Sequence, residues 1–379
     1  MSLNKPNSSP VLSRVLFLAQ RDEYGEFARY TADLAKAWQP ATIPTVWIEA
    51  DAPSVDFGDI PTETIARFNS FGAAKLARKM RSLNPQVVVS VGARAGQVGA
   101  SAARQAGVKQ TVHVALSDLI YTDYNLRRVI QNYLRLRSII RHTDRLVFPT
   151  YGNRYQLLLR GWAPEKKMYL LPATFDSREC PPDAKIAELK QIDAIPASTC
   201  RVVYAGPLRE RARLDWLLRA WSLVEASQRD AHLTIVGTGP CERALRNQAS
   251  CLNLKRCQVI QPQRSFIEYV AVADIVAITS LYETHTRLPL AAMGCKKPIV
   301  AMNSDGIREA LRNGKDAQLV EVGDVSRFAS ALMELIQNPQ RRSELAQAGR
   351  DRITHFGPEA FQRDALRLLA SLTGTGGAP

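Results

Sequence analysis

The sequence has no long hydrophobic segment. No run of apolar residues approaches the ~18 that a membrane-spanning helix needs. The first ten residues are polar and lack the apolar core of a secretory signal, so we expect residues 1–10 to be a disordered lead-in. These features argue against an integral membrane protein and against a cleaved signal peptide.

Cysteine and histidine are also scarce, with six cysteines and five histidines among 379 residues. There is no Cys-x-x-Cys pair and no Cys/His cluster with zinc-ligand spacing, so we expect no bound metal. Because disulfides are rare in reducing compartments, we expect six reduced thiols in a cytoplasmic protein. The six are Cys180, Cys200, Cys241, Cys251, Cys257 and Cys295.

Acidic residues are outnumbered by basic ones, 36 to 50, which gives a formal net charge of +14. Such a balance favours anionic partners, namely nucleic acid, anionic lipid or phosphorylated substrates. The sequence has no zinc finger, no RNP-type aromatic motif and no basic region joined to heptads. Nucleic acid is therefore not expected as a partner.

Short β-branched runs alternate with helical patterns along the chain. In the first half we predict strands at residues 15–19, 45–48, 86–91, 110–115 and 145–149, and helices at 26–38, 73–83, 99–106 and 125–142. Continuous apolar strands that alternate with helices predict an α/β fold, with a parallel sheet covered on both faces.

A second β/α series follows a proline-rich stretch. Its predicted strands are residues 201–205, 231–236, 257–260, 274–278, 298–301 and 317–320, and its predicted helices are 215–225, 326–337 and 339–354. Two such domains would face each other across a ligand crevice at the carboxyl ends of their sheets.

The boundaries follow from these patterns. We predict Rossmann-like domains at residues 11–176 and 201–357, joined by a linker at 177–200. A last helix at 358–372 can return to the N-terminal domain, and residues 373–379 are expected to form a flexible tail.

The most informative stretch runs from Ser280 to Pro298. Glu283 is followed at set spacings by Ala292-Met293-Gly294 and by Pro298, whereas the position eight residues after Glu283 holds Ala291. This stretch resembles the donor-binding signature of the family 4 glycosyltransferases, which have the GT-B fold. In that family a second Glu stands at the position of Ala291.

Four more motifs carry the resemblance, in the family's order, from about residue 140 to the end of the chain. They are the segment 145–176, the strand and helix at 204–220, the Gly237-Thr-Gly-Pro240 turn, and a Gly-x-x-Glu segment at 305–309. Each motif alone is common, but five in order are specific. The N-terminal domain is similar only in layout, with Gly25 as the remnant of an acceptor loop.

The resemblance implies a hexosyl or glycosyl transferase. A sugar would pass with retention from a nucleotide-diphosphate donor to a glycan or lipid-linked acceptor, in polysaccharide or cell-envelope assembly. The donor would lie against the C-terminal domain. An Arg, a Lys and the N–H groups of a helix N-terminus would stabilise the charge of the leaving diphosphate, without a metal or another cofactor.

Three of the implied donor positions are changed. By spacing, the family's Arg falls on Pro207, its Lys on Ala212 and its second, ribose-binding Glu on Ala291. The surrounding arginines are candidates to bind the phosphates, although they also suit a solvated loop face. They are Arg209, Arg211 and Arg213.

The segment before the helix near Leu288 is a second donor-binding candidate. The N–H groups of Thr284, His285, Thr286 and Arg287, with the helix dipole, would face the diphosphate. Arg287 can replace the missing basic residues. His285 is otherwise an exposed loop histidine.

Glu283 and His113 are the catalytic candidates. Glu283 would face the donor sugar, unless it caps the helix that begins near Leu288. His113 lies near the place where the family often has a histidine facing the donor, with Ser117 and Asp118 as competing positions. As a single histidine on a strand, His113 would otherwise be a packed residue.

The helix at 125–145 is basic. It carries arginines at 127, 128, 135, 137, 141 and 145, and Asp144 is its only acid. Its apolar residues have helical spacing, which predicts either an ordinary helix packed on its domain or a surface that docks on anionic lipid at the inner face of the membrane.

We therefore expect a cytoplasmic glycosyltransferase. The alternative is a catalytically degenerate GT-B protein that binds or scaffolds an active glycosyltransferase, because Pro207, Ala212 and Ala291 replace donor-site residues. A GT-B sugar-nucleotide epimerase would fit the architecture but not the five motifs.

Overall fold

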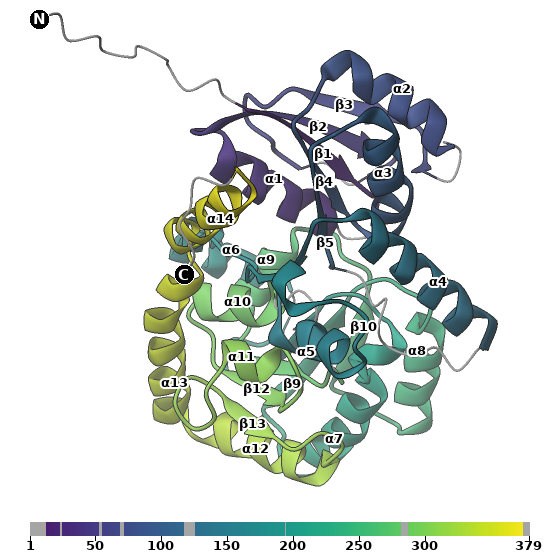
Figure 1. Cartoon of the computed structure of the whole chain (residues 1–379). Coiled ribbons are helices and arrows are strands. Elements are labelled where there is room, and N and C mark those ends of the chain that lie inside the picture. Colours follow the sequence, from purple (N-terminus) through teal and green to yellow (C-terminus); the bar gives the residue numbers. More distant parts are fainter. Residues whose placement is uncertain are drawn as a thin grey trace, which may run out of the picture. The chain divides into compact units, whose positions relative to one another are not determined.

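The computed structural model describes residues 13–22, 25–52, 55–68, 72–116, 126–193, 195–281 and 287–373 (Figure 1). The chain divides into two compact units. Unit 1 comprises residues 1–149, 153–172 and 361–379, and unit 2 comprises residues 150–152 and 173–360. The expected lead-in, and the expected tail from residue 374 on, lie outside the described residues.

Unit 1 is built on a seven-stranded sheet in the order β3-β2-β1-β4-β5-β6-β7, as far as the described residues go. All of its strand pairs are parallel, which confirms the prediction. Every residue of β4 is buried, because helices cover both faces of a parallel sheet. The strands are β1 (Ser13–Ala19), β2 (Thr42–Glu49), β3 (Thr62–Ile65), β4 (Val87–Val91), β5 (Gln110–Val114), β6 (Arg145–Phe148) and β7 (Met168–Leu170).

The helices of unit 1 largely follow the predicted pattern. They are α1 (Glu26–Trp38), α2 (Ala73–Leu83), α3 (Ala93–Ala106), α4 (Leu126–His142), α5 (Tyr151–Leu159) and α14 (Pro358–Thr373), of which α5 and α14 begin in unit 2. Helix α3 begins before the predicted residue 99, directly after Gly92, whose φ of +96° lets the chain turn sharply from β4.

Helix α14 packs on the N-terminal helix of unit 1. The Nε1 of Trp38 donates a hydrogen bond to the carbonyl of Ala365 at 2.7 Å, across a sequence separation of 327. The ring of Tyr30 meets that of Phe361 edge-on, with centroids 5.7 Å apart. The last helix therefore packs against α1, in the unit that contains the N-terminal part of the chain.

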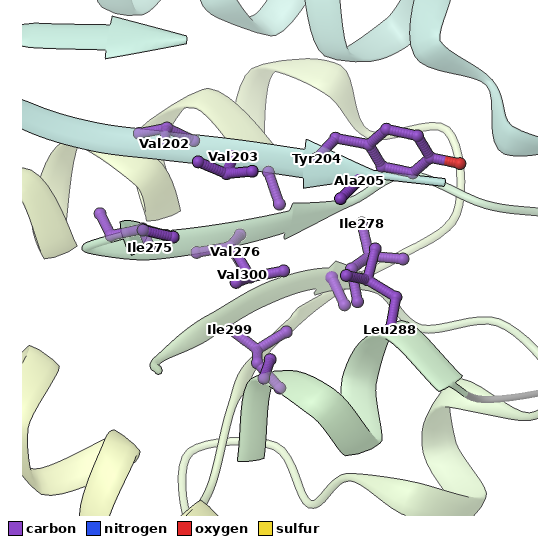
Figure 2. Close-up of a cluster of buried hydrophobic side chains, with 14 of the residues drawn as sticks. Val202, Val203, Tyr204, Ala205, Ile275, Val276, Ile278, Leu288, Ile299 and Val300 are labelled. Atoms are coloured by element: carbon purple, nitrogen blue, oxygen red, sulfur yellow. The ribbon is translucent and has the colours of Figure 1, made fainter. Parts of the chain in front are cut away.

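Unit 2 contains a six-stranded parallel sheet in the order β10-β9-β8-β11-β12-β13. Its strands are β8 (Cys200–Ala205), β9 (Ala231–Val236), β10 (Cys257–Ile260), β11 (Ile275–Ile278), β12 (Ile299–Met302) and β13 (Gln318–Val320). Strands β8, β11 and β12 are buried along their whole length, and their side chains belong to one buried cluster with Leu288 of α10, which lies near Ile278 (Figure 2).

The helices of unit 2 include several that hydrophobic patterning does not predict. They are α6 (Asp183–Ile192), α7 (Leu214–Ser227), α8 (Glu242–Cys251), α9 (Phe266–Val272), α10 (Arg287–Gly294), α11 (Ile307–Ala310), α12 (Val325–Gln337) and α13 (Pro339–Arg352). Helix α6 lies in the stretch expected as a linker. None of the helices in the described part of either unit has both the length and the hydropathy of a membrane span.

A disulfide joins Cys180 to Cys295 within unit 2, with their Cα atoms 5.5 Å apart. The prediction of six reduced thiols is therefore wrong for these two residues. The two cysteines are 115 residues apart, and only the fold brings them together. The other cysteines, Cys200, Cys241, Cys251 and Cys257, are free thiols.

Candidate functional site

The strand order of unit 2 reverses between β8 and β11. From β8 the chain moves through β9 to β10, and it then returns to place β11 on the other side of β8. Parallel α/β sheets bind ligands at such a switch point, because the loops that leave the two strands diverge there. The loops after β8 and β11 are therefore the candidate binding loops of unit 2.

The loop after β8 packs on the Gly237–Pro240 turn after β9. The N–H of Leu208 donates to the carbonyl of Thr238 at 2.8 Å, and the N–H of Cys241 donates to the carbonyl of Leu208 at 3.0 Å. A Cβ on Gly237 would lie 1.9 Å from the Gly206 carbonyl oxygen, and one on Gly239 would lie 2.5 Å from that of Leu208. The two glycines are required because the two backbones touch.

The loop after β11 is joined to the loop after β8. The hydroxyl of Thr279 donates to the carbonyl of Ala212 at 2.8 Å, and the N–H of Leu281 donates to the carbonyl of Arg211 at 2.9 Å. These bonds hold the chain, as far as residue 281, beside the loop after β8. The predicted site residues Glu283, Thr284, His285 and Thr286 lie outside the described residues.

Arg213 is held in place on its own loop. Its guanidinium donates two hydrogen bonds to the carboxylate of Asp215, at 2.9 and 2.8 Å, and lies 3.9 Å from the ring centre of Trp216. Burial alone would raise the pKa of Asp215, but the hydrogen bonds from Arg213 and the positive charges of Arg213 and Arg219 together hold that pKa below its ordinary value. Arg209 and Arg211 are partly exposed on the same loop.

The changed donor positions are well packed. Ala212 and Ala291 are both buried in the unit 2 core, with exposed fractions of 4% and 0%. A charged side chain at either position would have to displace apolar neighbours, at a large desolvation cost. The carbonyl of Pro207 accepts a hydrogen bond from the hydroxyl of Tyr204 at 3.1 Å.

Arg287 is the first residue of α10. Its guanidinium lies 3.4 Å from the carboxylate of Glu179 and near the rings of Phe175 and Phe266, at 6.0 and 5.7 Å. The side chain of Arg287 is 20% exposed. A cation is thus placed at the positive end of a helix dipole, on the candidate binding side of unit 2.

Glu309 has a role that its motif did not reveal. Its carboxylate accepts hydrogen bonds from the N–H groups of Tyr151 and Gly152, at 2.7 and 3.0 Å. These N–H groups are at the start of α5 and belong to unit 2. Burial raises the pKa of Glu309 above its ordinary value, and the two hydrogen bonds offset this only in part.

In unit 1 the strand order reverses between β1 and β4. Gly25, the predicted acceptor-loop residue, precedes α1 with a left-handed φ of 70°. The carboxylate of Asp22 accepts hydrogen bonds from the N–H groups of Glu26 and Phe27, both at 2.9 Å. Asp22 therefore caps α1. An Asp shortly before a helix was the available signal for it.

His113 is deeply buried in β5, with 1% of its surface exposed. Its Nδ1 lies 3.1 Å from the Ser90 hydroxyl, and its ring packs against Gly96 of α3. Its Nε2 is buried without a hydrogen-bond partner among the described residues. Burial lowers the pKa of His113 to about 4, so the imidazole is neutral at neutral pH. Ser117 and Asp118 lie outside the described residues.

Residues 199–338 match the family described as Glycosyl transferases group 1. The chain is 26% identical over 265 residues to D-inositol 3-phosphate glycosyltransferase of Rhodococcus jostii (strain RHA1), covering 66% of this chain and 58% of that protein. It is 25% identical over 236 residues to the lipopolysaccharide core biosynthesis glycosyltransferase LpsE of Rhizobium meliloti (strain 1021), covering 62% and 66%. The chain thus spans less than two thirds of the length of these relatives.

Solved structures share the fold, HepE and sucrose-phosphate synthase among them. HepE of Anabaena, in complex with UDP and glucose, has a TM-score of 0.80 at 20% identity and covers 95% of this chain and 100% of that one. Sucrose-phosphate synthase of Thermosynechococcus elongatus has a TM-score of 0.79 at 17% identity and covers 96% and 100%. The predicted GT-B fold is confirmed.

Proposed function

We propose that this chain, which has the GT-B fold and a glycosyl transferases group 1 domain, transfers a sugar from a nucleotide-diphosphate donor to a glycan or lipid-linked acceptor, with retention. The family match over residues 199–338 carries the proposal. It includes the loop after β8, the Gly237–Pro240 turn and helix α10. The relatives named above are described as transferases, and they give no support to the alternative of a scaffold without activity.

The donor would bind at the switch point between β8 and β11. As the bond from the anomeric carbon to the β-phosphate oxygen breaks, the bonding electrons leave with the nucleotide diphosphate. Arg287 and the positive end of α10 would stabilise this charge, with Arg209 and Arg211 on the loop after β8 as further cations. In this proposal no metal takes part. The acceptor hydroxyl then forms the new bond to the anomeric carbon, and its proton passes to a phosphate oxygen of the leaving nucleotide diphosphate.

The ribose must be held differently from the family's pattern. Ala291 has no group that could accept hydrogen bonds from the ribose diol, and each such bond to a charged acceptor is worth about 1.5–3 kcal/mol. Donor affinity would therefore depend on the phosphate contacts more than on the ribose. This makes Arg287 the most informative residue to change.

Helix α4 would bring the enzyme to a lipid-linked acceptor by docking on anionic lipid. Leu136 and Ile139 pack in the core of unit 1, whereas Ile130, Tyr133 and Leu134 are exposed. Arg127, Arg137 and Arg141 are exposed on the same helix. Apolar side chains flanked by arginines are suited to the interface of an anionic membrane.

A nucleotide titration tests the proposal. We expect UDP to bind the purified protein with a dissociation constant in the micromolar to low millimolar range by calorimetry, and GDP or ADP to bind more weakly. HepE, solved with UDP, is the reason to begin with that nucleotide. If a folded sample binds no nucleoside diphosphate at millimolar concentration, the transferase proposal fails and the scaffold alternative replaces it.

A further inference from the structure

A segment of unit 2, residues 175–180, contacts the residues at the two ends of α10. Phe175 packs on Gly294, where a Cβ would lie 2.3 Å from its ring. Glu179 pairs with Arg287 at 3.4 Å, and Cys180 is bonded to Cys295. All of these contacts are within unit 2.

The positions that the segment contacts form one stripe on the helix. Residues 287, 294 and 295 follow the i, i+7, i+8 spacing that places side chains on a single face. Ala291, between the contacted ends of this stripe, is completely buried. The segment is therefore attached at both ends of α10, by an ion pair at the first residue and by a covalent bond just after the last.

We propose that the Cys180–Cys295 disulfide is a thiol-exchange site that controls donor binding, by keeping Glu179 on Arg287. The inference rests on the proposed function, in which Arg287 binds the donor diphosphate. With the disulfide formed, the carboxylate of Glu179 competes with the diphosphate for the same guanidinium. With the disulfide reduced, the competing carboxylate is tethered less closely.

The covalent bond matters because the ion pair alone is weak. Both of its side chains are partly exposed, at 20% for Arg287 and 26% for Glu179, and such pairs are screened by solvent and salt. Cys180 is the neighbour of Glu179 in the chain, so the disulfide raises the effective concentration of the carboxylate at Arg287. Breaking it lets the segment move away when a diphosphate arrives.

The chemistry requires a dithiol reductant. Its thiolate attacks the partly exposed Cys180 sulfur, and Cys295, which is 9% exposed, leaves as a thiolate that takes up a proton. The second thiol of the reductant then displaces Cys180. Two electrons and two protons pass to the protein as two thiols, and the reductant becomes a disulfide. In a reducing compartment the protein would be in its binding form, and oxidation would inhibit it.

The test compares the two forms of the full chain. Maleimide labelling under denaturing conditions should modify four cysteines without reductant and six after reduction by a phosphine. Calorimetry with UDP should give at least fivefold weaker binding for the oxidised form. Cys180→Ser, and separately Glu179→Gln, should bind UDP as the reduced wild type does, with or without reductant. Cys251→Ser, at an exposed free thiol, should respond to reductant as the wild type does.

The outcomes separate the two proposals. Six labelled cysteines without reductant, or equal UDP affinity in the two forms, would overturn the exchange site. If neither form binds UDP, the proposed function fails. Amide hydrogen exchange then tests whether the disulfide holds the segment on α10. Faster exchange at the amides of residues 176–182 after reduction would support the attachment, and unchanged exchange would overturn it. Reduction of the wild type gives this answer even if Cys180→Ser does not fold.

Discussion

The Gly206 carbonyl oxygen and the Cα of Gly237 approach so closely that a Cβ on Gly237 would lie 1.9 Å from that oxygen. This contact joins the loops after β8 and β9 at the carboxyl edge of the unit 2 sheet. The Gly237-Thr-Gly-Pro240 turn, one of the motifs that carry the family resemblance, is therefore first a packing requirement between two backbones. Any ligand-binding role depends on that packing.

Gly237→Ala should destabilise unit 2 by more than about 2 kcal/mol, because a backbone oxygen cannot move aside as a flexible side chain would. Urea unfolding measures the change. Gly357→Ala is the matched control in unit 2, since its φ of −74° suits any residue and its new Cβ would make only ordinary contacts at 3.5 Å. Equal stability of the two variants would contradict the packing argument.

Arg287→Ala should weaken UDP binding about 10-fold to 100-fold, the loss expected for a hydrogen-bonded charge pair. The UDP affinity of Arg287→Lys should lie between those of Arg287→Ala and the wild type, because a lysine keeps the charge but not the planar guanidinium. Arg327→Ala, at an exposed site on α12, is the control for loss of one positive charge. Unchanged affinity in Arg287→Ala, measured by calorimetry, would remove Arg287 from the donor site.

Glu309→Ala should cost about 0.5–2 kcal/mol of stability, because it removes the acceptor for two N–H groups at the start of α5. Glu309→Gln keeps one acceptor oxygen and should therefore lose less stability than Glu309→Ala. The raised pKa of Glu309 means that the folded state binds the extra proton, so this group's contribution to stability falls as pH rises through that pKa. Glu309→Gln should remove this part of the pH dependence, and identical profiles would refute the assignment.

His113 should make stability depend on pH in the opposite direction. Its pKa is lowered from 6.5 to about 4, so between these values the unfolded chain binds the proton and the folded chain does not. The contribution is complete above pH 6.5 and is lost as pH falls towards 4, up to about 3 kcal/mol. His113→Asn should flatten this slope in denaturant titrations. A variant that keeps the slope but loses turnover would instead place His113 in the reaction.

Helix α4 should be required for binding to anionic vesicles. Leu134→Ser with Arg137→Glu should reduce flotation with anionic liposomes at least fivefold at physiological salt, because it removes both apolar and electrostatic contacts. Leu134→Ser with Arg78→Glu, which moves the charge reversal to the exposed surface of α2, should reduce it less. Binding that does not change with salt or with either variant would exclude this surface.

The elements that sequence patterns predicted are those with a clear apolar period. Helices α1 and α2 begin and end at the predicted residues, and the central strands are mostly apolar and buried along their whole length. Helices α6 and α8 were missed because each buries a single residue, Leu189 or Leu245, and so shows no apolar stripe. Strand β3 was missed because only its last residue, Ile65, is buried.

In the candidate site, too, sequence patterns located the elements but not the contacts between distant residues. The family motifs located the loops after β8, β9 and β11, since residue type and spacing are local properties of the chain. The capping of α5 by Glu309 depends on which groups the fold brings within hydrogen-bond reach, because Glu309 and Tyr151 are 158 residues apart. Sequence spacing could name Glu309 but could not assign its partner.

The sequence by itself therefore determined two parallel α/β units and located the Gly237-Thr-Gly-Pro240 turn, because periodicity and the spacing of residue types are local properties of the chain. Only the tertiary structure decided that Cys180 bonds to Cys295, that α14 packs against α1, and that Glu179 lies on Arg287. These pairs are 115, 327 and 108 residues apart. Contacts over such distances depend on how the whole chain packs, which no local pattern records.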